Sequence, residues 1–142
     1  MNKKEISNLL IRYLILLLIA FPNLYIIYKI FTPLTIYPIF WILNLFYEAS
    51  LENTLIIFNE NSIDLIQACI AGAAYYLLLI LNFSTPMELN KRLKRLLFLL
   101  SSFLIINIIR IVLFSVLFLN GYQYFDLAHS LTWYFGSTIL VV

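Results

Sequence analysis

The sequence predicts an all-α polytopic membrane protein with about four transmembrane helices, a short interfacial or re-entrant helix and a small outer β-hairpin. Hydrophobic residues make up 63% of the 142 residues and charged residues only 11%, whereas soluble proteins average roughly 45–50% and about 25%. The apolar residues also form long runs, separated by short stretches that hold most of the charge. A soluble domain of this length could not bury so much apolar surface, so soluble enzymes and nucleic-acid-binding modules are excluded as classes.

The first predicted span covers residues 6–31 and follows Lys3 and Lys4. Its apolar run is longer than the core of a signal peptide, and no small-residue cleavage site follows it. We therefore interpret this segment as an uncleaved membrane helix, with a kink expected at Pro22.

Residues 33–47 are also apolar, with Pro33 and Pro38 near their start. As a helix this segment would reach about 22 Å, less than the roughly 30 Å hydrocarbon core of a bilayer. It is either a short tilted span or a helix that lies in the membrane interface.

Residues 48–66 form the longest polar stretch, with four acidic and no basic residues. Within it, two β-prone runs at 54–58 and 62–66 flank Asn59-Glu60-Asn61. Strand-like runs around an Asn-rich turn predict a small β-hairpin.

Three further spans are predicted over residues 67–83, 96–119 and 128–142. The intervening loop, residues 84–95, should contain a short helix capped by Ser84 or Thr85. This loop ends in a basic cluster, which consists of Lys91, Arg92, Lys94 and Arg95.

The basic residues predict the orientation, because Lys and Arg concentrate in cytoplasmic loops. The N-terminus and residues 84–95 then lie on the cytoplasmic side of the cell membrane, and the acidic stretch 48–66 lies on the outer side. A separate crossing by 33–47 would put the basic cluster outside, so the interfacial or re-entrant helix is favoured for that segment. The whole chain is expected to form one multi-pass domain.

With this orientation, the three chemically notable residues fall on the outer side of the membrane. Cys69 and His129 each lie in the first turn of an inward-going span. Arg110 lies past the midpoint of the outward-going span 96–119, and its long side chain can extend toward water. An arginine within a span costs roughly 2.5–3.5 kcal/mol on insertion scales, so it marks a functional site by default.

Together these residues form a catalytic set. A thiolate is a nucleophile that a nearby cation favours, a histidine transfers protons, and an arginine can hold an oxyanion. Asn107, one helical turn before Arg110, can support the guanidinium or the site itself. One His and one Cys fall short of a usual ligand set, so neither a metal nor another cofactor is expected.

Each residue also has a plainer interpretation. Cys69 can be a small buried hydrophobe, and its small neighbours can be a helix-packing surface. Arg110 and Asn107 can form structural hydrogen bonds between spans, and His129 can be an interfacial polar residue.

The ordered pattern resembles the exosortase/archaeosortase family of membrane-embedded cysteine transpeptidases. Three features carry the resemblance: a polar stretch that runs into Ala68-Cys69, the segment Asn107-Ile108-Ile109-Arg110-Ile111, which is similar to the family's Asn-x-x-Arg-Ile, and His129 at the start of the next span. The resemblance covers about residues 33–142. The family commonly has Cys-Ser-Gly, whereas here Gly72 comes one position later. The chain is similar to a small, divergent member of archaeal type.

The resemblance implies a protein-sorting enzyme with Cys69 as nucleophile, Arg110 as the activating or oxyanion residue and His129 as the proton-transfer residue. Its substrates would be secreted proteins with a C-terminal motif, a transmembrane segment and a basic tail. It would cleave near the motif on the outer face and transfer the new C-terminus to an acceptor such as a membrane lipid. A hydrolase that uses water as acceptor remains an alternative, as does a non-enzymatic assembly subunit or small transporter component with a structural Arg110.

Overall fold

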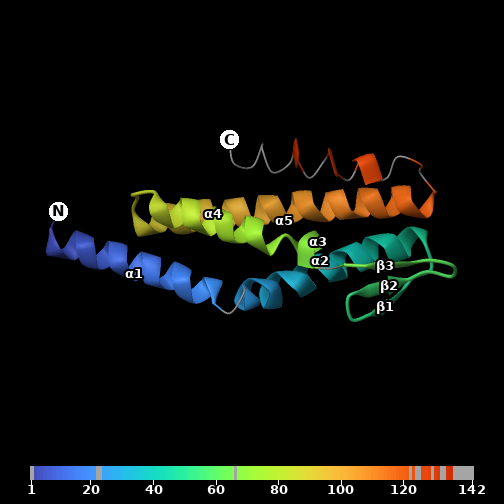
Figure 1. Cartoon of the computed structure of the whole chain (residues 1–142), viewed down its shortest axis with the longest axis horizontal. Helices are drawn as coiled ribbons and strands as arrows, with labels where there is room; N and C mark the ends of the chain where they lie inside the picture. Colours follow the sequence, from blue (N-terminus) through green and yellow to red (C-terminus); the bar gives the residue numbers. More distant parts are fainter. Residues whose placement is uncertain are drawn as a thin grey trace.

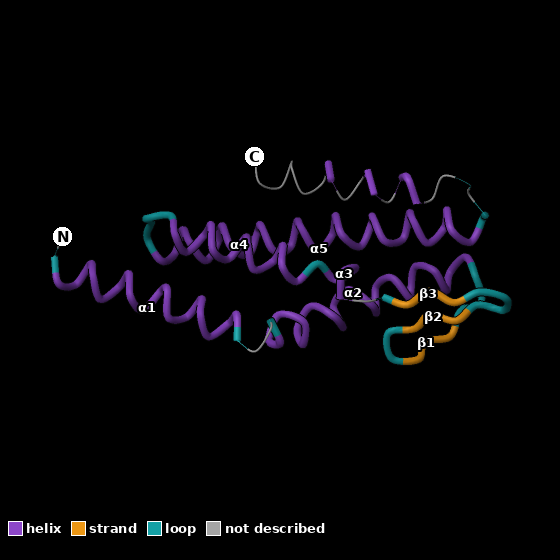
Figure 2. Tube along the Cα trace, viewed as in Figure 1, coloured by secondary structure: helices purple, strands orange, loops and turns teal. Residues whose placement is uncertain are grey.

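The fold is mostly helical, with a small three-stranded sheet at one end (Figure 1). The computed structural model describes residues 2–21, 24–65, 67–121, 123, 126–128, 130–131 and 134–135. Its elements occur in the order α1, α2, β1, β2, β3, α3, α4 and α5. The N-terminus and the α4–α5 connection lie at one end of the long axis, and the sheet lies at the other (Figure 2).

Helices α1 (Lys3–Ala20) and α2 (Tyr25–Phe46) replace the predicted span 6–31 and the separate helix 33–47. Helix α1 ends at Ala20 and α2 begins directly after Leu24, whose φ of 61° is left-handed, so the helices are not divided at residue 32. Pro22, where a kink was predicted, lies outside the described residues. Pro33 and Pro38 both lie inside α2, where each removes one backbone donor and favours a bend rather than an end. The two helices follow one another along the long axis in the same direction (Figure 1).

The predicted span 67–83 is divided into a short helix α3 (Gln67–Ile70) and a longer helix α4 (Gly72–Ser84). Ala71 separates them with a φ of 60°. With 13 residues, α4 reaches only about 20 Å.

Helix α5 (Leu89–Leu119) begins well before the predicted span 96–119. The helix expected within 84–95 is present as the first turns of α5, which carry the basic cluster and continue directly into the apolar run. The predicted cap is wrong, because the N-cap residue is Glu88, whereas Ser84 and Thr85 lie at the end of α4. Straight-chain basic residues are good helix formers, and they give no stop signal here.

Arg92 is the one member of the basic cluster that is buried, with 5% of its surface exposed. Its guanidinium donates hydrogen bonds to the carbonyls of Phe83 at 3.1 Å, Thr85 at 2.9 Å and Met87 at 3.4 Å. These carbonyls lie at and just after the end of α4, where the helix leaves acceptors without intrahelical partners. Arg92 thus joins the end of α4 to the start of α5.

The sheet consists of β1 (Ser50–Glu52), β2 (Leu55–Ile57) and β3 (Ser62–Asp64), antiparallel in the order β1-β2-β3. The predicted hairpin is confirmed as β2–β3, which is joined through Asn59-Glu60-Asn61. The additional strand β1 was not predicted. It joins β2 through a tight turn at Asn53, whose φ is 57°.

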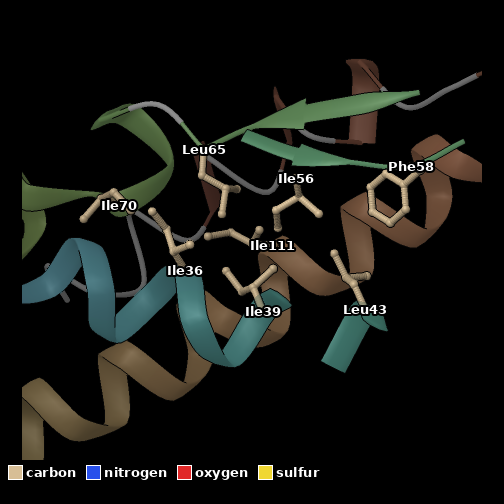
Figure 3. Packing of buried hydrophobic residues seen from close by; sticks show 8 residues of the cluster. All are labelled: Ile36, Ile39, Leu43, Ile56, Phe58, Leu65, Ile70 and Ile111. Carbon is tan, nitrogen blue, oxygen red and sulfur yellow. The ribbon is translucent and has the colours of Figure 1, made fainter. Parts of the chain in front are cut away.

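The main core lies where the sheet packs against α2 and α5, which also contact each other (Figure 3). Ile39 and Leu43 of α2 and Ile56 of β2 are fully buried. Ile111 contributes the surface of α5, and Leu65 and Ile70 close the core on the side that leads to α3 (Figure 3). Cys69 packs against this core, so the sheet and α5 together fix its position.

Of the helices that the structure describes, α2 and α5 are long and apolar enough to cross a membrane. The prediction of four transmembrane helices is not supported. Helix α1 carries four charged residues within its 18 residues, and α4 is short. Most of the predicted last span, 128–142, lies outside the described residues.

Candidate functional site

Cys69 and Arg110 line the same cavity of about 190 Å³, near the sheet. Cys69 comes from α3 and Arg110 from α5, so residues 41 positions apart meet where these two helices and β3 come together. The remaining lining is mostly apolar and consists of Ser62, Ile63, Leu65, Ile111, Phe114, Ser115 and Phe118. The cavity therefore combines a thiol, a guanidinium and an apolar wall.

The thiol and the guanidinium line the same cavity, where a charge on the sulfur would interact with the charge of Arg110. Both residues are half-buried, so this interaction is screened less than it would be on an open surface. None of the described lining residues is acidic. A thiolate formed at Cys69 would share this cavity with the guanidinium of Arg110, and a neighbouring cation is one of the features that make a thiol reactive.

Asn107 holds the backbone that carries Cys69. Its side-chain amide donates hydrogen bonds to the carbonyls of Cys69 at 3.0 Å and Ile70 at 3.4 Å, and only 3% of its surface is exposed. The sequence predicted that Asn107 supports either the guanidinium or the site itself. The two hydrogen bonds of its amide are of the second kind, because they reach the backbone at the cysteine.

These carbonyls need an external donor because α3 ends at Ile70. A helix leaves its last carbonyls without intrahelical partners, and the left-handed Ala71 turns the chain before the next N–H groups can reach them. Helix α4 then begins with its own bonds, as Tyr75 donates to the Ala71 carbonyl at 3.3 Å. The amide of Asn107 replaces the missing helical donors.

The break brings α4 close to α2 at Gly72. A Cβ atom at this position would lie 2.6 Å from the ring of Tyr28, so a larger residue would require the end of this side chain to move. The left-handed φ belongs to Ala71, which is the second residue after Cys69 and the place where the Cys-Ser-Gly pattern has glycine. The helix break at Ala71 and the close approach at Gly72 are therefore separate features, at neighbouring residues.

Sequence reasoning missed the apolar wall of the cavity. Ile111, Phe114, Ser115 and Phe118 recur at helical spacing after Asn107 and share one face of α5. That periodicity is visible in the sequence, but after the basic cluster apolar residues also cover the other faces of α5, so the pattern alone did not distinguish this face.

His129 lies outside the described residues. The structure brings together Cys69, Arg110 and the backbone support from Asn107, and the proposed role of His129 stays a prediction.

Comparison of the chain with protein-family models, with curated proteins and with solved structures found no match. The case for a function therefore rests on the residues and geometry of the site.

Proposed function

We propose that this chain is a multi-pass membrane cysteine transpeptidase or peptidase of the exosortase/archaeosortase type, with its active site at the outer face of the cell membrane. The observation that carries the proposal is the shared cavity of Cys69 and Arg110. A lone cysteine or a lone intramembrane arginine has ordinary explanations. A thiol and a guanidinium that interact beside an apolar cavity are the components of covalent acyl transfer.

In the proposed reaction, the Cys69 sulfur attacks the carbonyl carbon of a peptide bond. An S–C bond forms, the C–N bond breaks, and the proton of the thiol ends on the leaving amine. An acceptor hydroxyl or water then attacks the thioester, and its proton returns to the sulfur. Arg110 stabilises the oxyanion of each tetrahedral intermediate, and His129 carries the proton between sulfur, amine and acceptor.

The exposed surface of α5 supports the membrane assignment. Leu97 and Phe98 are each 70% exposed, and apolar side chains surround them along the helix. Leaving such surface in water costs roughly 25 cal/mol for each Å². Lipid removes this cost, and the same reasoning applies to the exposed apolar residues of α2.

The distribution of charge supports the outer placement of the site. Lys3, Lys4 and the basic cluster lie at the end of the molecule that contains the α4–α5 connection (Figure 1). The acidic residues of 48–66 lie at the sheet end, and β3 at that end lines the cavity. The positive-inside rule then directs the cavity outward.

The proposal predicts that secreted proteins with a motif, an apolar segment and a basic tail lose that tail only when Cys69 is present. Wild type and Cys69→Ala are compared in cells at matched membrane abundance, and mass spectrometry identifies the C-termini of the secreted proteins. We expect tails to be retained in Cys69→Ala. Ser101→Ala, at an exposed position of α5, serves as the control and should trim like wild type.

Equal trimming by Cys69→Ala would show that the thiol is not the nucleophile. A non-enzymatic membrane subunit, with Arg110 and Asn107 as structural residues, would then be the better account.

A further inference from the structure

We propose that the polypeptide substrate binds as an added β-strand on the outer edge of β3, which presents its backbone to Cys69. This inference rests on the proposed function, because it describes how a peptide bond reaches the thiol. Strand addition uses backbone hydrogen bonds for affinity and leaves side-chain pockets to provide selectivity.

The hydrogen bonds on either side of β3 establish which of its residues face β2. The Phe58 N–H donates to the Asn61 carbonyl at 2.7 Å, and the Leu65 N–H donates to the Thr54 carbonyl at 3.0 Å. In an antiparallel pair, residues bonded to the partner alternate with residues that point away. The backbone N–H and C=O groups of residues 61, 63 and 65 therefore point toward β2.

Ser62 and Asp64 consequently direct their backbone N–H and C=O groups away from β2. β3 is the terminal strand in the order β1-β2-β3, and no strand of the described part of the chain pairs with its outer side. The edge thus offers two donors and two acceptors at the spacing of a strand, which is the template that an extended peptide completes.

This edge borders the cavity that contains the thiol. Ser62 and Ile63 both line the cavity together with Cys69 and Arg110. Neighbouring residues of a strand point to opposite faces of a sheet, so a cavity that both of them line extends along the edge of β3. A peptide paired with Ser62 and Asp64 would place a backbone carbonyl beside Cys69.

The apolar lining of the cavity selects the side chains of such a peptide. Ile111, Phe114 and Phe118 of α5 line the cavity together with Ser62 and Ile63 of β3. Alternate side chains of the bound strand would pack against this apolar wall. The occupant is therefore an extended peptide with an apolar residue close to the scissile bond.

The test uses acetyl-Val-Ala-Val chloromethyl ketone, which alkylates a thiol with release of chloride, and chloroacetone as the matched reagent without a peptide. The rate of Cys69 labelling is measured by mass spectrometry on the full chain in detergent micelles. We expect the peptide reagent to react at least tenfold faster than chloroacetone. N-methylation of one of two neighbouring peptide nitrogens should abolish this advantage, and N-methylation of the other should preserve it, because only alternate N–H groups face the edge.

Ser62→Pro tests the protein side of the same contact, because it removes an outward N–H and leaves the bonds to β2 in place. In this variant, the ratio of the labelling rate with the peptide reagent to the rate with chloroacetone should fall toward one. Leu51→Pro is the control at the other edge, and it is the harsher substitution because Leu51 packs against the core. Ser50 and Glu52 pair with the residues of β2 that face away from β3, so Leu51 points outward at the opposite edge of the sheet. This variant should keep the ratio of wild type.

The outcomes separate the docking mode from the function. If Cys69 reacts with chloroacetone and the peptide gives no advantage, strand addition is wrong and the cysteine site stands. The same conclusion follows if the two N-methylated peptides behave alike, as they would where the edge is filled by another segment of this chain. A Cys69 that reacts with neither reagent would overturn the proposed function and this inference with it.

Discussion

At the scale of single residues, the position of the thiol depends on a side-chain amide. Asn107 satisfies two carbonyls that α3 leaves open at its end, and it does so from a buried position on a different helix. A buried acceptor that loses its donor costs about 1–3 kcal/mol. The two hydrogen bonds from Asn107 therefore stabilise the fold and also hold the backbone that positions the sulfur.

We predict that Asn107→Ala lowers the free energy of unfolding by about 1–3 kcal/mol, because both carbonyls lose their donor and a small void remains. Thermal unfolding in detergent measures the change. Asn90→Ala, at an exposed position in the first turn of α5, is the control and should change stability by less than about 0.5 kcal/mol. Equal effects of the two substitutions would mean that the amide contributes nothing.

Part of this site could be predicted from residue types and orientation. Cys69 and Arg110 were expected on one side of the membrane, and they line one cavity. The partner of Asn107 could not be predicted, because it is a backbone carbonyl that becomes available only where the helix breaks. Nothing in the sequence marks Ala71 as a left-handed residue, since alanine is the strongest helix former.

At the scale of elements, the sequence predicted that the β2–β3 hairpin and the apolar helices exist. It predicted less well where the helices begin and end. Pro33 and Pro38 suggested the start of a separate helix, but α2 passes through both of them. The break occurs near Leu24 instead. Proline lowers helix stability without fixing where a helix ends, and packing against α5 outweighs it here.

At the break between α3 and α4, the same alanine-to-glycine substitution should affect stability differently at position 71 and at position 73. At Ala71 a glycine relieves about 1–2 kcal/mol of left-handed strain, which exceeds the roughly 0.8 kcal/mol lost with a buried methyl group. We expect Ala71→Gly to be neutral or stabilising by up to about 1 kcal/mol. Ala73→Gly, exposed within α4, should destabilise by about 0.5–1 kcal/mol. Thermal unfolding compares them, and equal destabilisation would contradict the strain at Ala71.

At the scale of the whole molecule, α1 and α2 form one path from the basic end to the sheet (Figure 1). The reversal of direction that a separate crossing by 33–47 would require is therefore unnecessary. The acidic sheet end and the basic α4–α5 end lie at opposite ends of the molecule (Figure 1), and under the proposed function the charge rule places them on opposite sides of the membrane.

This arrangement predicts the accessibility of two exposed sites in a Cys69→Ala background. A cysteine at Glu60 should react in intact cells with a membrane-impermeant maleimide. A cysteine at Lys91 should react only after the membrane is permeabilised. Mass-shift electrophoresis reads both, and the reverse pattern would put the cavity on the cytoplasmic side.

The central claim is that Arg110 makes the Cys69 thiol reactive, and the rate of its alkylation tests this most directly. Iodoacetamide labelling at neutral pH is measured for wild type, Arg110→Gln and the control Lys94→Gln, which removes the same charge from an exposed position at the far end of α5. A charge pair worth about 1.4 kcal/mol changes the thiolate fraction roughly tenfold. We predict that Arg110→Gln slows labelling by roughly tenfold while Lys94→Gln reacts like wild type. Equal rates in all three proteins would contradict the claim.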